Sequence, residues 1–371
     1  MKAIAVFPKD RRYGVIDHPE PRLASPHGVV LRMIEVGICG TDKEIVSFEY
    51  GQPPEGSDYL VIGHESLGEV VEVGAEVTHL KTGDLAVATV RRPCGIPSCI
   101  ACAAERQDFC YTGQYTERGI MKRHGYMTGF VAEDARYVNP VPAGLRDVAV
   151  LVEPLTIAEK GVAQLWEIQS RLPWASTGAS GAPSGRGRKA LVLGAGPVGL
   201  LGTMKLVLEG FETTVYSRTP PGSSVADLVA SVGAKFVAAE SADVPALARQ
   251  MGNIDVVYEA VGASSLAFEV MGFLGVNGAF ILTGVPGHKP PIGVNTDALM
   301  RDRVLKNQVV FGTVNADLED FRRAIADIGE FSRRWPKALR GIISHRVPLE
   351  QAIEPLSGKI GGIKNVISVG S

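Results

Sequence analysis

Four of the five cysteines in this chain lie close together, at Cys94, Cys99, Cys102 and Cys110. Their spacing, C-x4-C-x2-C-x7-C, is compatible with a disulfide framework, a redox pair or a metal site. Four thiolates can close a tetrahedral shell around a structural zinc ion, and such a shell leaves no open position for chemistry. The cluster alone does not decide between these three interpretations.

The fifth cysteine lies apart from this cluster and closer to two other metal-binding residue types. Cys39 follows a strand-like run, and His64 and Glu65 are neighbours in the segment VIGHESLGEVVEVG. Zinc accepts thiolate, imidazole and carboxylate ligands, and a catalytic zinc keeps one position open for water or substrate. Each residue alone also fits an ordinary role, with Cys39 as a small buried residue, His64 as a core histidine and Glu65 as a surface charge.

A glycine-rich turn later in the chain is suited to binding phosphate. Gly194, Gly196 and Gly199 form a G-x-G-x-x-G pattern in LVLGAGPVGLLG, with Pro197 and Val198 inside it. Between a strand and a helix, the first glycine permits the tight turn, the second lets the backbone approach a pyrophosphate, and the third allows close packing. The phosphates then meet the unpaired amides of the helix N-terminus. This turn predicts a dinucleotide site.

The end of the next strand indicates which dinucleotide is favoured. NAD-selective sites present a carboxylate about twenty residues after the glycines, where it holds the ribose 2′-hydroxyl. This chain has Ser217 and Arg218 there instead. Arg218 can hold a 2′-phosphate by charge-assisted hydrogen bonds, and Ser217 avoids the repulsion that a carboxylate would cause. We therefore expect NADP(H) to be preferred and NAD(H) to be accepted; the alternative is that Arg218 is a solvated loop arginine.

Two patterns of secondary structure surround these residues. Residues 1–150 contain short alternating or β-branched runs broken by turns, which predicts an antiparallel, barrel-like β domain. From Lys189, apolar runs alternate with helix-length stretches, as in parallel βαβ units, and ADLEDFRRAIADI after Asn315 is typical of an amphipathic helix. Residues 173–187, rich in Gly, Ser and Ala, predict a flexible surface loop, with a functional lid as the alternative.

Length and composition limit the classes of protein that fit. A chain of 371 residues exceeds the usual size of one core, so two domains are expected. The net charge of −2 provides no polybasic surface, and Arg91, Arg92 and Arg106 near the cysteine cluster are offset by Glu105 and Asp108, so we expect no nucleic-acid partner. We find neither a signal peptide nor an apolar run long enough to span a membrane. A cytoplasmic location is therefore expected, where clustered cysteines are more often metal ligands than disulfides.

One spacing in this sequence is highly specific. The pattern G-H-E-x-x-G-x5-G-x-x-V is formed by Gly63, His64, Glu65, Gly68, Gly74 and Val77. Together with Cys39-Gly40-Thr41-Asp42 upstream and the cysteine cluster downstream, it resembles the zinc-containing medium-chain alcohol dehydrogenases over almost the whole chain. The resemblance implies an α/β protein with a GroES-like β-barrel catalytic domain, formed by 1–165 and 316–371, and a Rossmann doubly wound parallel sheet, 166–315.

Within that family the chain is most similar to the glucose dehydrogenases of archaeal type, which oxidise aldoses at C1 to lactones. The similarity rests on AERQDFC (104–110), ERGI (117–120), GYM (125–127), LVEPLTIAEK (151–160), FGTVN (311–315) and WPKALRGII (335–343). It implies a catalytic zinc held by Cys39, His64, Glu65 and Glu153, and a structural zinc in the cysteine cluster, two zincs per chain. It also implies that Thr41 relays a proton and that Thr41, Glu117, Glu153 and Asn315 contact the sugar.

The sequence departs at three places from the family that it resembles, and other functions stay open. Some relatives have an aspartate where this chain has Ile157, the loop at 173–187 is longer than the family needs, and the first gap in the cysteine cluster is wider than usual. The alternatives are a polyol, threonine or other secondary-alcohol dehydrogenase of the same family, and a non-catalytic NADP(H)-binding protein. Relatives assemble through the edge of the Rossmann sheet, which implies a homodimer or homotetramer.

Overall fold

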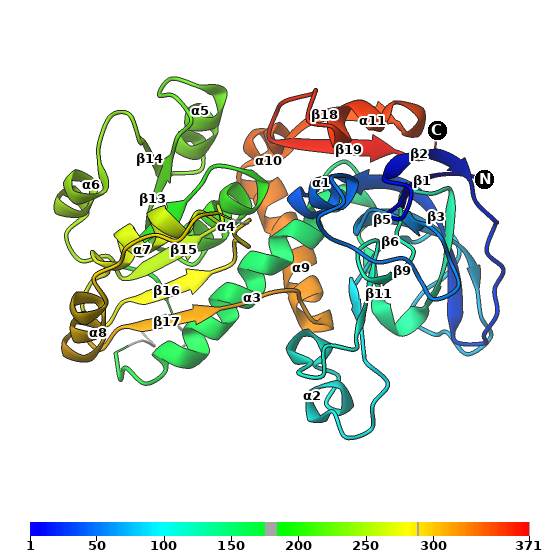
Figure 1. The fold of residues 1–371 in the computed structure, drawn as a ribbon, viewed down its shortest axis with the longest axis horizontal. Helices are drawn as coiled ribbons and strands as arrows, with labels where there is room; N and C mark the ends of the chain where they lie inside the picture. The colour runs from blue at the N-terminus through cyan, green and yellow to red at the C-terminus, as the bar shows by residue number, and fades with distance from the viewer. Residues whose placement is uncertain (175–183, 288, 371) are drawn as a thin grey trace. The chain divides into compact units, whose positions relative to one another are not determined.

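The computed structural model describes residues 1–174, 184–287 and 289–370, which form two compact units (Figure 1). Unit 1 comprises Met1–Thr156, Asn315–Arg334 and Ile342–Ser371, and unit 2 comprises Ile157–Val314 and Trp335–Gly341. The first boundary falls inside helix α3 (Val152–Gln169), whereas the sequence analysis placed it after 165. The sequence does not predict this boundary, because a continuous helix contains no linker-like segment at the point where the two units meet. Most of the loop expected at 173–187 lies outside the described residues.

Unit 1 is built mainly from antiparallel strands, in agreement with the alternating sequence pattern. Its largest sheet has the order β11-β6-β5-β3-β19-β18, and β10 also pairs with β3. These strands are β3 (Gly28–Gly37), β5 (Glu65–Val73), β6 (Leu85–Ala88), β10 (Phe130–Asp134), β11 (Val138–Val141), β18 (Ile343–Pro348) and β19 (Lys364–Ser368). Two smaller sheets have the orders β2-β1-β4 and β7-β8-β9. Their strands are β1 (Lys2–Phe7), β2 (Arg12–Asp17), β4 (Leu60–Val61), β7 (Arg91–Arg92), β8 (Thr116–Arg118) and β9 (Lys122–Arg123).

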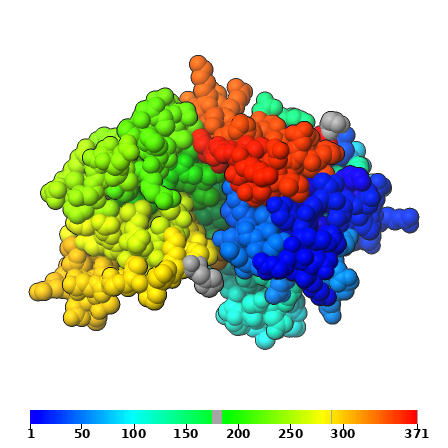
Figure 2. Space-filling view, turned by 45° about the horizontal axis from the view of Figure 1, so that its top comes forward, coloured from blue at the N-terminus to red at the C-terminus, as the bar shows by residue number. Residues whose placement is uncertain are grey.

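The central strand of unit 1 joins the two ends of the chain. Strand β3 is buried along almost its whole length and pairs with β5, β10 and the C-terminal strand β19. The C-terminal segment therefore lies against the N-terminal part of the chain, as the red and blue surfaces in Figure 2 show. Strands β18 and β19, and also β8 and β9, pair in parallel. Period-two alternation shows which face of a strand is buried but not the direction of its partner.

The helices of unit 1 are α1 (Gly40–Val46), α2 (Ile100–Ala103), α9 (Leu318–Arg334) and α11 (Ile353–Leu356). Helix α9 confirms the amphipathic helix predicted after Asn315. Its first turn is closed by Asp317, whose carboxylate accepts the Asp320 amide at 2.8 Å, and by Asp320, whose carboxylate accepts the Asp317 amide at 3.0 Å. This reciprocal pair satisfies two amides that have no partner within the helix.

Unit 2 contains a six-stranded parallel sheet with the order β14-β13-β12-β15-β16-β17. The strands are β12 (Lys189–Leu193), β13 (Glu212–Ser217), β14 (Lys235–Ala238), β15 (Val256–Glu259), β16 (Ala279–Leu282) and β17 (Val309–Gly312). The order reverses between β12 and β15, and ligands of open parallel sheets bind beyond the carboxyl ends of the strands at such a point. The sheet is therefore of the Rossmann type that the βαβ pattern predicts.

Helices connect the strands of unit 2 (Figure 1). They are the C-terminal part of α3 together with α4 (Pro197–Leu208), α5 (Ser224–Ser231), α6 (Val244–Met251), α7 (Ser264–Met271) and α8 (Thr296–Leu305). Helix α10 (Pro336–Ile342) belongs to unit 2 up to Gly341, where the chain returns to unit 1. Pro197 stands in the first turn of α4, where its missing amide costs no hydrogen bond. Among the described residues, no helix combines the length and the apolar character that crossing a membrane requires.

Candidate functional site

Unit 1 brings Cys39, His64 and Glu65 together, with their ligand atoms all within 4.8 Å of one another. Cys39 precedes the first residue of α1, and Glu65 opens β5, where it lies opposite Gly37 of β3. His64 and Glu65 are buried, and Cys39 is partly exposed. Sulfur, nitrogen and oxygen donors in this arrangement fit zinc, and the partly exposed cysteine leaves a side from which a substrate can approach.

The residue before His64 explains why the motif begins with glycine. Gly63 has a φ of +91°, in the region that side chains rarely adopt, and a Cβ there would lie 2.6 Å from Met127 Cγ and 2.8 Å from Val36 Cγ1. Gly119 packs just as closely, because a Cβ on it would lie 2.3 Å from the Gly63 carbonyl oxygen. The segment that follows Glu117 therefore lies directly against the segment that carries His64.

Asp42 contacts both Cys39 and the segment that carries His64 and holds them in position. Its Oδ2 accepts the Cys39 amide at 2.8 Å, its Oδ1 accepts the Gly63 amide at 3.2 Å, and Oδ1 lies 3.6 Å from His64 Nδ1. Burial of the imidazole opposes protonation, but attraction to Asp42 and contact with Cys39 outweigh it and raise the pKa of His64 well above its usual range. Asp42 belongs to the motif Cys39-Gly40-Thr41-Asp42, but its type and spacing predicted no such role.

A buried lysine that the sequence analysis missed pairs with Glu65. Lys364 Nζ lies 2.6 Å from Glu65 Oε1 and 2.5 Å from Oε2, and it donates to the Ile38 carbonyl oxygen at 2.9 Å. Burial opposes the charge on Lys364, but Glu65 and Cys39 raise its pKa. Lys364 is 2% exposed, so its ammonium compensates the Glu65 carboxylate inside the protein. The available signal was a single lysine opening the apolar C-terminal strand β19.

The structure does not place Glu153 within the metal-binding group of Cys39, His64 and Glu65. Glu153 stands in the first turn of α3, where Thr156 Oγ1 donates to its carbonyl oxygen at 2.6 Å. Burial raises the pKa of Glu153 to about 7, with His64 lowering it and Glu65 raising it, so the carboxylate is close enough to interact electrostatically with both. Thr41 contacts the group, with its Oγ1 3.9 Å from Cys39 Sγ.

Glu117 and Asn315, far apart in sequence, are in direct contact. Asn315 Nδ2 donates to Glu117 Oε1 at 2.8 Å, and Arg91 Nε donates to the same oxygen at 3.0 Å. Arg91 also donates through Nη1 to the Asp108 carbonyl oxygen at 3.1 Å, so one guanidinium connects Glu117 with the cysteine lobe. Both Arg91 and Glu117 are buried. The sequence analysis mentioned Arg91 only as part of the local charge balance.

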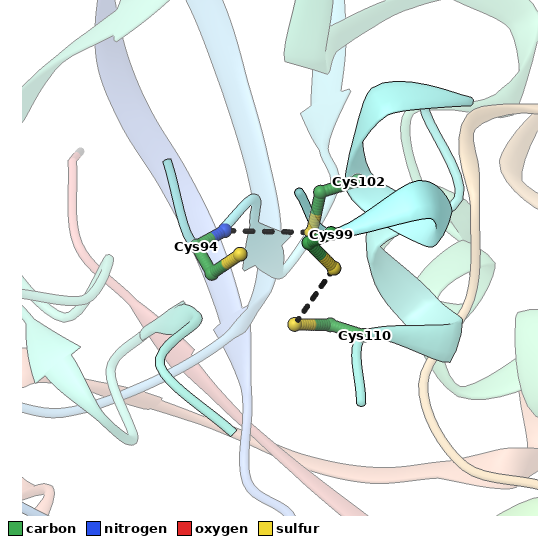
Figure 3. Close-up of side chains that lie close together, drawn as sticks. All are labelled: Cys94, Cys99, Cys102 and Cys110. Atoms are coloured by element: carbon green, nitrogen blue, oxygen red, sulfur yellow. Dashed lines mark hydrogen bonds between the residues drawn. The ribbon is translucent and has the colours of Figure 1, made fainter. Parts of the chain in front are cut away.

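The other four cysteines form a second group that could hold a metal ion, around the short helix α2 (Figure 3). Their sulfur atoms lie within 4.8 Å of one another, and all four are free thiols. Cys99 and Cys110 sulfurs are 3.9 Å apart, and the Cys94 amide points at the Cys102 sulfur at 3.5 Å. A hydrogen bond with the Thr112 side chain lowers the pKa of Cys94 to about 6. Four converging sulfurs fit a closed structural zinc shell, despite the wide first gap.

The nucleotide-binding turn lies at the carboxyl end of β12, as the strand-turn-helix pattern predicts. Gly194 follows the strand and donates its amide to the Tyr216 carbonyl oxygen of β13 at 2.9 Å, and α4 begins at Pro197. At the end of β13, Ser217 Oγ accepts the Thr219 amide at 3.2 Å. The exposed Arg218 forms no ion pair with a described residue.

Comparison with known proteins agrees with this architecture. A model described as "Glucose dehydrogenase C-terminus" matches residues 146–369, and one described as "Alcohol dehydrogenase GroES-like domain" matches residues 25–143. The glucose 1-dehydrogenase of Methanocella arvoryzae is 39% identical over 372 residues and that of Thermoproteus tenax 40% over 377 residues. The alignments cover 100% of this chain and 100% and 99% of those proteins.

A solved structure gives the same result in three dimensions. The glucose dehydrogenase of Haloferax mediterranei, in complex with NADP, Zn and gluconolactone, matches with a TM-score of 0.87 at 29% sequence identity, and 100% of each chain is covered. The fold and the metal-binding groups define a zinc-containing medium-chain dehydrogenase, an oxidoreductase that acts on alcohols. Within that class, the chain belongs to the glucose dehydrogenase family.

Proposed function

We propose that this protein oxidises an aldose, with D-glucose as the first candidate, at C1 to the lactone and transfers the hydride to NADP+. The observation that carries the proposal is the thiolate, imidazole and carboxylate group at Cys39, His64 and Glu65, directly against the segment that bears Glu117. The Haloferax structure with gluconolactone and the glucose 1-dehydrogenases similar over the full chain support the sugar assignment.

In this proposal, each residue of the site has a separate role in the reaction. Zinc bound at Cys39 and His64, with Glu65 or Glu153 as a further ligand, would polarise the C1 hydroxyl and lower its pKa. Thr41, whose Oγ1 lies 3.9 Å from Cys39 Sγ, would pass the hydroxyl proton towards solvent. Glu117 and Asn315, which contact each other, would bind the other sugar hydroxyls through a carboxylate and an amide. The C1–H bond breaks with both electrons going to the dinucleotide, so one aldose and one NADP+ yield one lactone, one NADPH and one proton.

The remaining cofactor proposals rest on the two other sites. The four-cysteine lobe would hold a structural zinc with no catalytic role, which makes two zincs per chain. Arg218 and Ser217 would hold the 2′-phosphate of NADP(H), and NAD(H) would bind less tightly because it lacks this group. These proposals are independent of the sugar.

A rate panel tests the function. Reduction of NADP+ and NAD+ is followed by absorbance with D-glucose, D-galactose, D-xylose, a polyol and threonine, before and after chelation of zinc. We expect activity on at least one aldose, a preference for NADP+, and loss of activity when zinc is removed. Activity on the polyol or threonine alone would replace the substrate assignment, and undiminished activity without zinc would refute the mechanism.

A further inference from the structure

Glu259, the last residue of β15, is a buried acid with no role in the metal, sugar or 2′-phosphate sites described above. It is 2% exposed. Its Oε1 accepts the amides of Val261 and Gly262, both at 2.8 Å, and its Oε2 accepts the amide of Gly284 at 3.2 Å. A single carboxylate therefore binds backbone donors from the loop after β15 and from the loop after β16.

The position of Glu259 in the sheet relates these contacts to ligand binding. Glu259 pairs with Leu193, the last residue of β12, on one side and with Leu282, the last residue of β16, on the other. The sheet order reverses between β12 and β15, so Glu259 stands at the switch point where open parallel sheets bind their ligands. The two loops it connects border the half of the crevice opposite the strand end that carries Arg218.

The connected loops pack directly on the nucleotide-binding turn. A Cβ on Gly194, the first glycine of the turn, would lie 2.6 Å from Val261 Cγ2. A Cβ on Gly284 would lie 2.1 Å from the Gly262 amide nitrogen and 2.7 Å from Glu259 Oε2. The loops thus leave no room for a side chain at Gly284, and the Glu259 carboxylate accepts hydrogen bonds from both.

We propose that Glu259 is a positioning residue for the nicotinamide half of the dinucleotide. A dinucleotide crosses the switch point from one half of the sheet to the other. Its adenosine half falls on the side of β13, where Ser217 and Arg218 end the strand, so its nicotinamide half falls on the side of β15 and β16. By holding the loops of these two strands together and against the glycine turn, Glu259 shapes the surface on which the nicotinamide half lies. This inference rests on the proposed binding of NADP(H).

The test compares two ligands that share the adenosine half. Wild-type protein, Glu259→Gln and Glu259→Ala are titrated with NADPH, followed by its fluorescence, and with adenosine 2′,5′-bisphosphate, followed by calorimetry. The glutamine variant loses the charge on its acceptors and turns an amide donor towards backbone N–H groups, so we expect NADPH to bind about 10- to 100-fold more weakly. Adenosine 2′,5′-bisphosphate, which lacks the nicotinamide half, should bind within about twofold of wild type.

Two further variants complete the design. Glu269→Gln removes an exposed carboxylate from α7 of the same unit and should bind both ligands like wild type. Gly284→Ala keeps Glu259 but inserts a Cβ between the two loops, and it should reproduce the selective loss of NADPH.

The outcomes separate a positioning role from a structural one. An equal loss of both ligands, including loss through unfolding, would overturn the proposal, and so would NADPH binding within twofold of wild type in Glu259→Gln and Glu259→Ala. Failure of the wild-type protein to bind NADPH would instead refute the proposed function. Steady-state kinetics adds a second readout, because the KM for NADP+ should rise in Glu259→Gln while the KM for the aldose and the zinc content stay unchanged.

Discussion

Arg91 shows how a single buried side chain sets the geometry of the candidate sugar site. Its guanidinium donates to Glu117 Oε1 at 3.0 Å and to the Asp108 carbonyl oxygen at 3.1 Å, and it lies 3.8 Å from the centre of the Tyr115 ring. The planar fork of an arginine can serve two acceptors and stack on a ring at once, whereas a lysine ammonium is a point charge on a flexible stem. Arg91 therefore fixes which way the Glu117 carboxylate faces.

The substitution Arg91→Lys should raise the KM for the aldose about 5- to 100-fold, the range expected when a buried acceptor loses its partner. The KM for NADP+ should stay within about twofold, because Arg91 belongs to unit 1 and the nucleotide-binding turn to unit 2. Steady-state kinetics with each substrate varied in turn measures both values. Arg146→Lys, at an exposed arginine of the same unit, is the matched control. Equal increases in both KM values would contradict a role in orienting Glu117.

At the scale of elements, Glu133 ties three short strands together. Its Oε2 accepts Arg92 Nη2 of β7 at 2.6 Å and Arg118 Nε of β8 at 2.7 Å, while Glu133 itself belongs to β10. All three side chains are buried. Burial opposes ionisation of Glu133, but Arg118 and Arg92 hold its pKa well below the usual range. Such short strands form few backbone hydrogen bonds with one another, and the ion pairs add to the stability of their packing.

The lowered pKa of Glu133 predicts how stability depends on pH. Because the folded-state pKa lies below the unfolded value of about 4.3, this contribution is complete at neutral pH and is lost as the pH falls below that value towards the folded pKa. Glu133→Gln should lower the free energy of unfolding by about 3 to 5 kcal/mol at pH 7, since it leaves buried arginines uncompensated.

Denaturant unfolding between pH 7 and pH 3 measures this effect. The gap in stability between wild type and Glu133→Gln should narrow as the pH falls from about 4.3 to 3, because the unfolded wild-type chain then takes up a proton that the folded Glu133 does not. Glu72→Gln, at an exposed glutamate, should track wild type at every pH. A constant gap between wild type and Glu133→Gln across the whole range would show that the carboxylate charge is not the cause.

The cysteine lobe gives a second prediction at this scale. Cys99→Ser removes one of four sulfurs from a closed shell, so elemental analysis should find about one zinc per chain instead of about two. Cys39→Ser should likewise leave about one zinc, bound in the lobe. Of the two single-zinc proteins only Cys99→Ser should retain measurable turnover. Two zincs in Cys99→Ser would contradict the four-sulfur assignment.

At the scale of the whole molecule, unit 2 exposes apolar side chains that a second copy of the chain would cover. Met300, Val304 and Leu305 on α8 are 71%, 68% and 68% exposed, and the next strand, β17, is the last strand of the sheet, with no partner on its outer edge among the described residues. Exposed apolar residues beside an open strand edge favour association. They support the homodimer or homotetramer implied by the family resemblance.

Light scattering tests this assembly. Wild type should have the mass of a dimer or tetramer, and Val304→Glu should shift it towards the monomer, because a carboxylate buried in an apolar interface is costly. Val15→Glu changes an exposed valine of β2 in unit 1 and should leave the mass unchanged. A monomeric wild type would refute the expected oligomer.

Much of this protein could be predicted from its sequence, because the relevant signals are local. Alternating β-runs, the βαβ pattern and the glycine turn depend on residues close together in the chain, and they predicted both folds. The G-H-E spacing carries the family resemblance, which implies a metal site at Cys39, His64 and Glu65. Only the tertiary structure showed that Lys364 neutralises Glu65, that Arg91 links Glu117 to the cysteine lobe, and that Glu259 joins two loops. Buried charged groups pair with whichever opposite charge lies nearby in the folded structure. The distance between two residues along the chain does not predict such a pair. The unit boundary inside α3 and the position of Glu153 also depend on packing, because both are set by which segments contact one another in space.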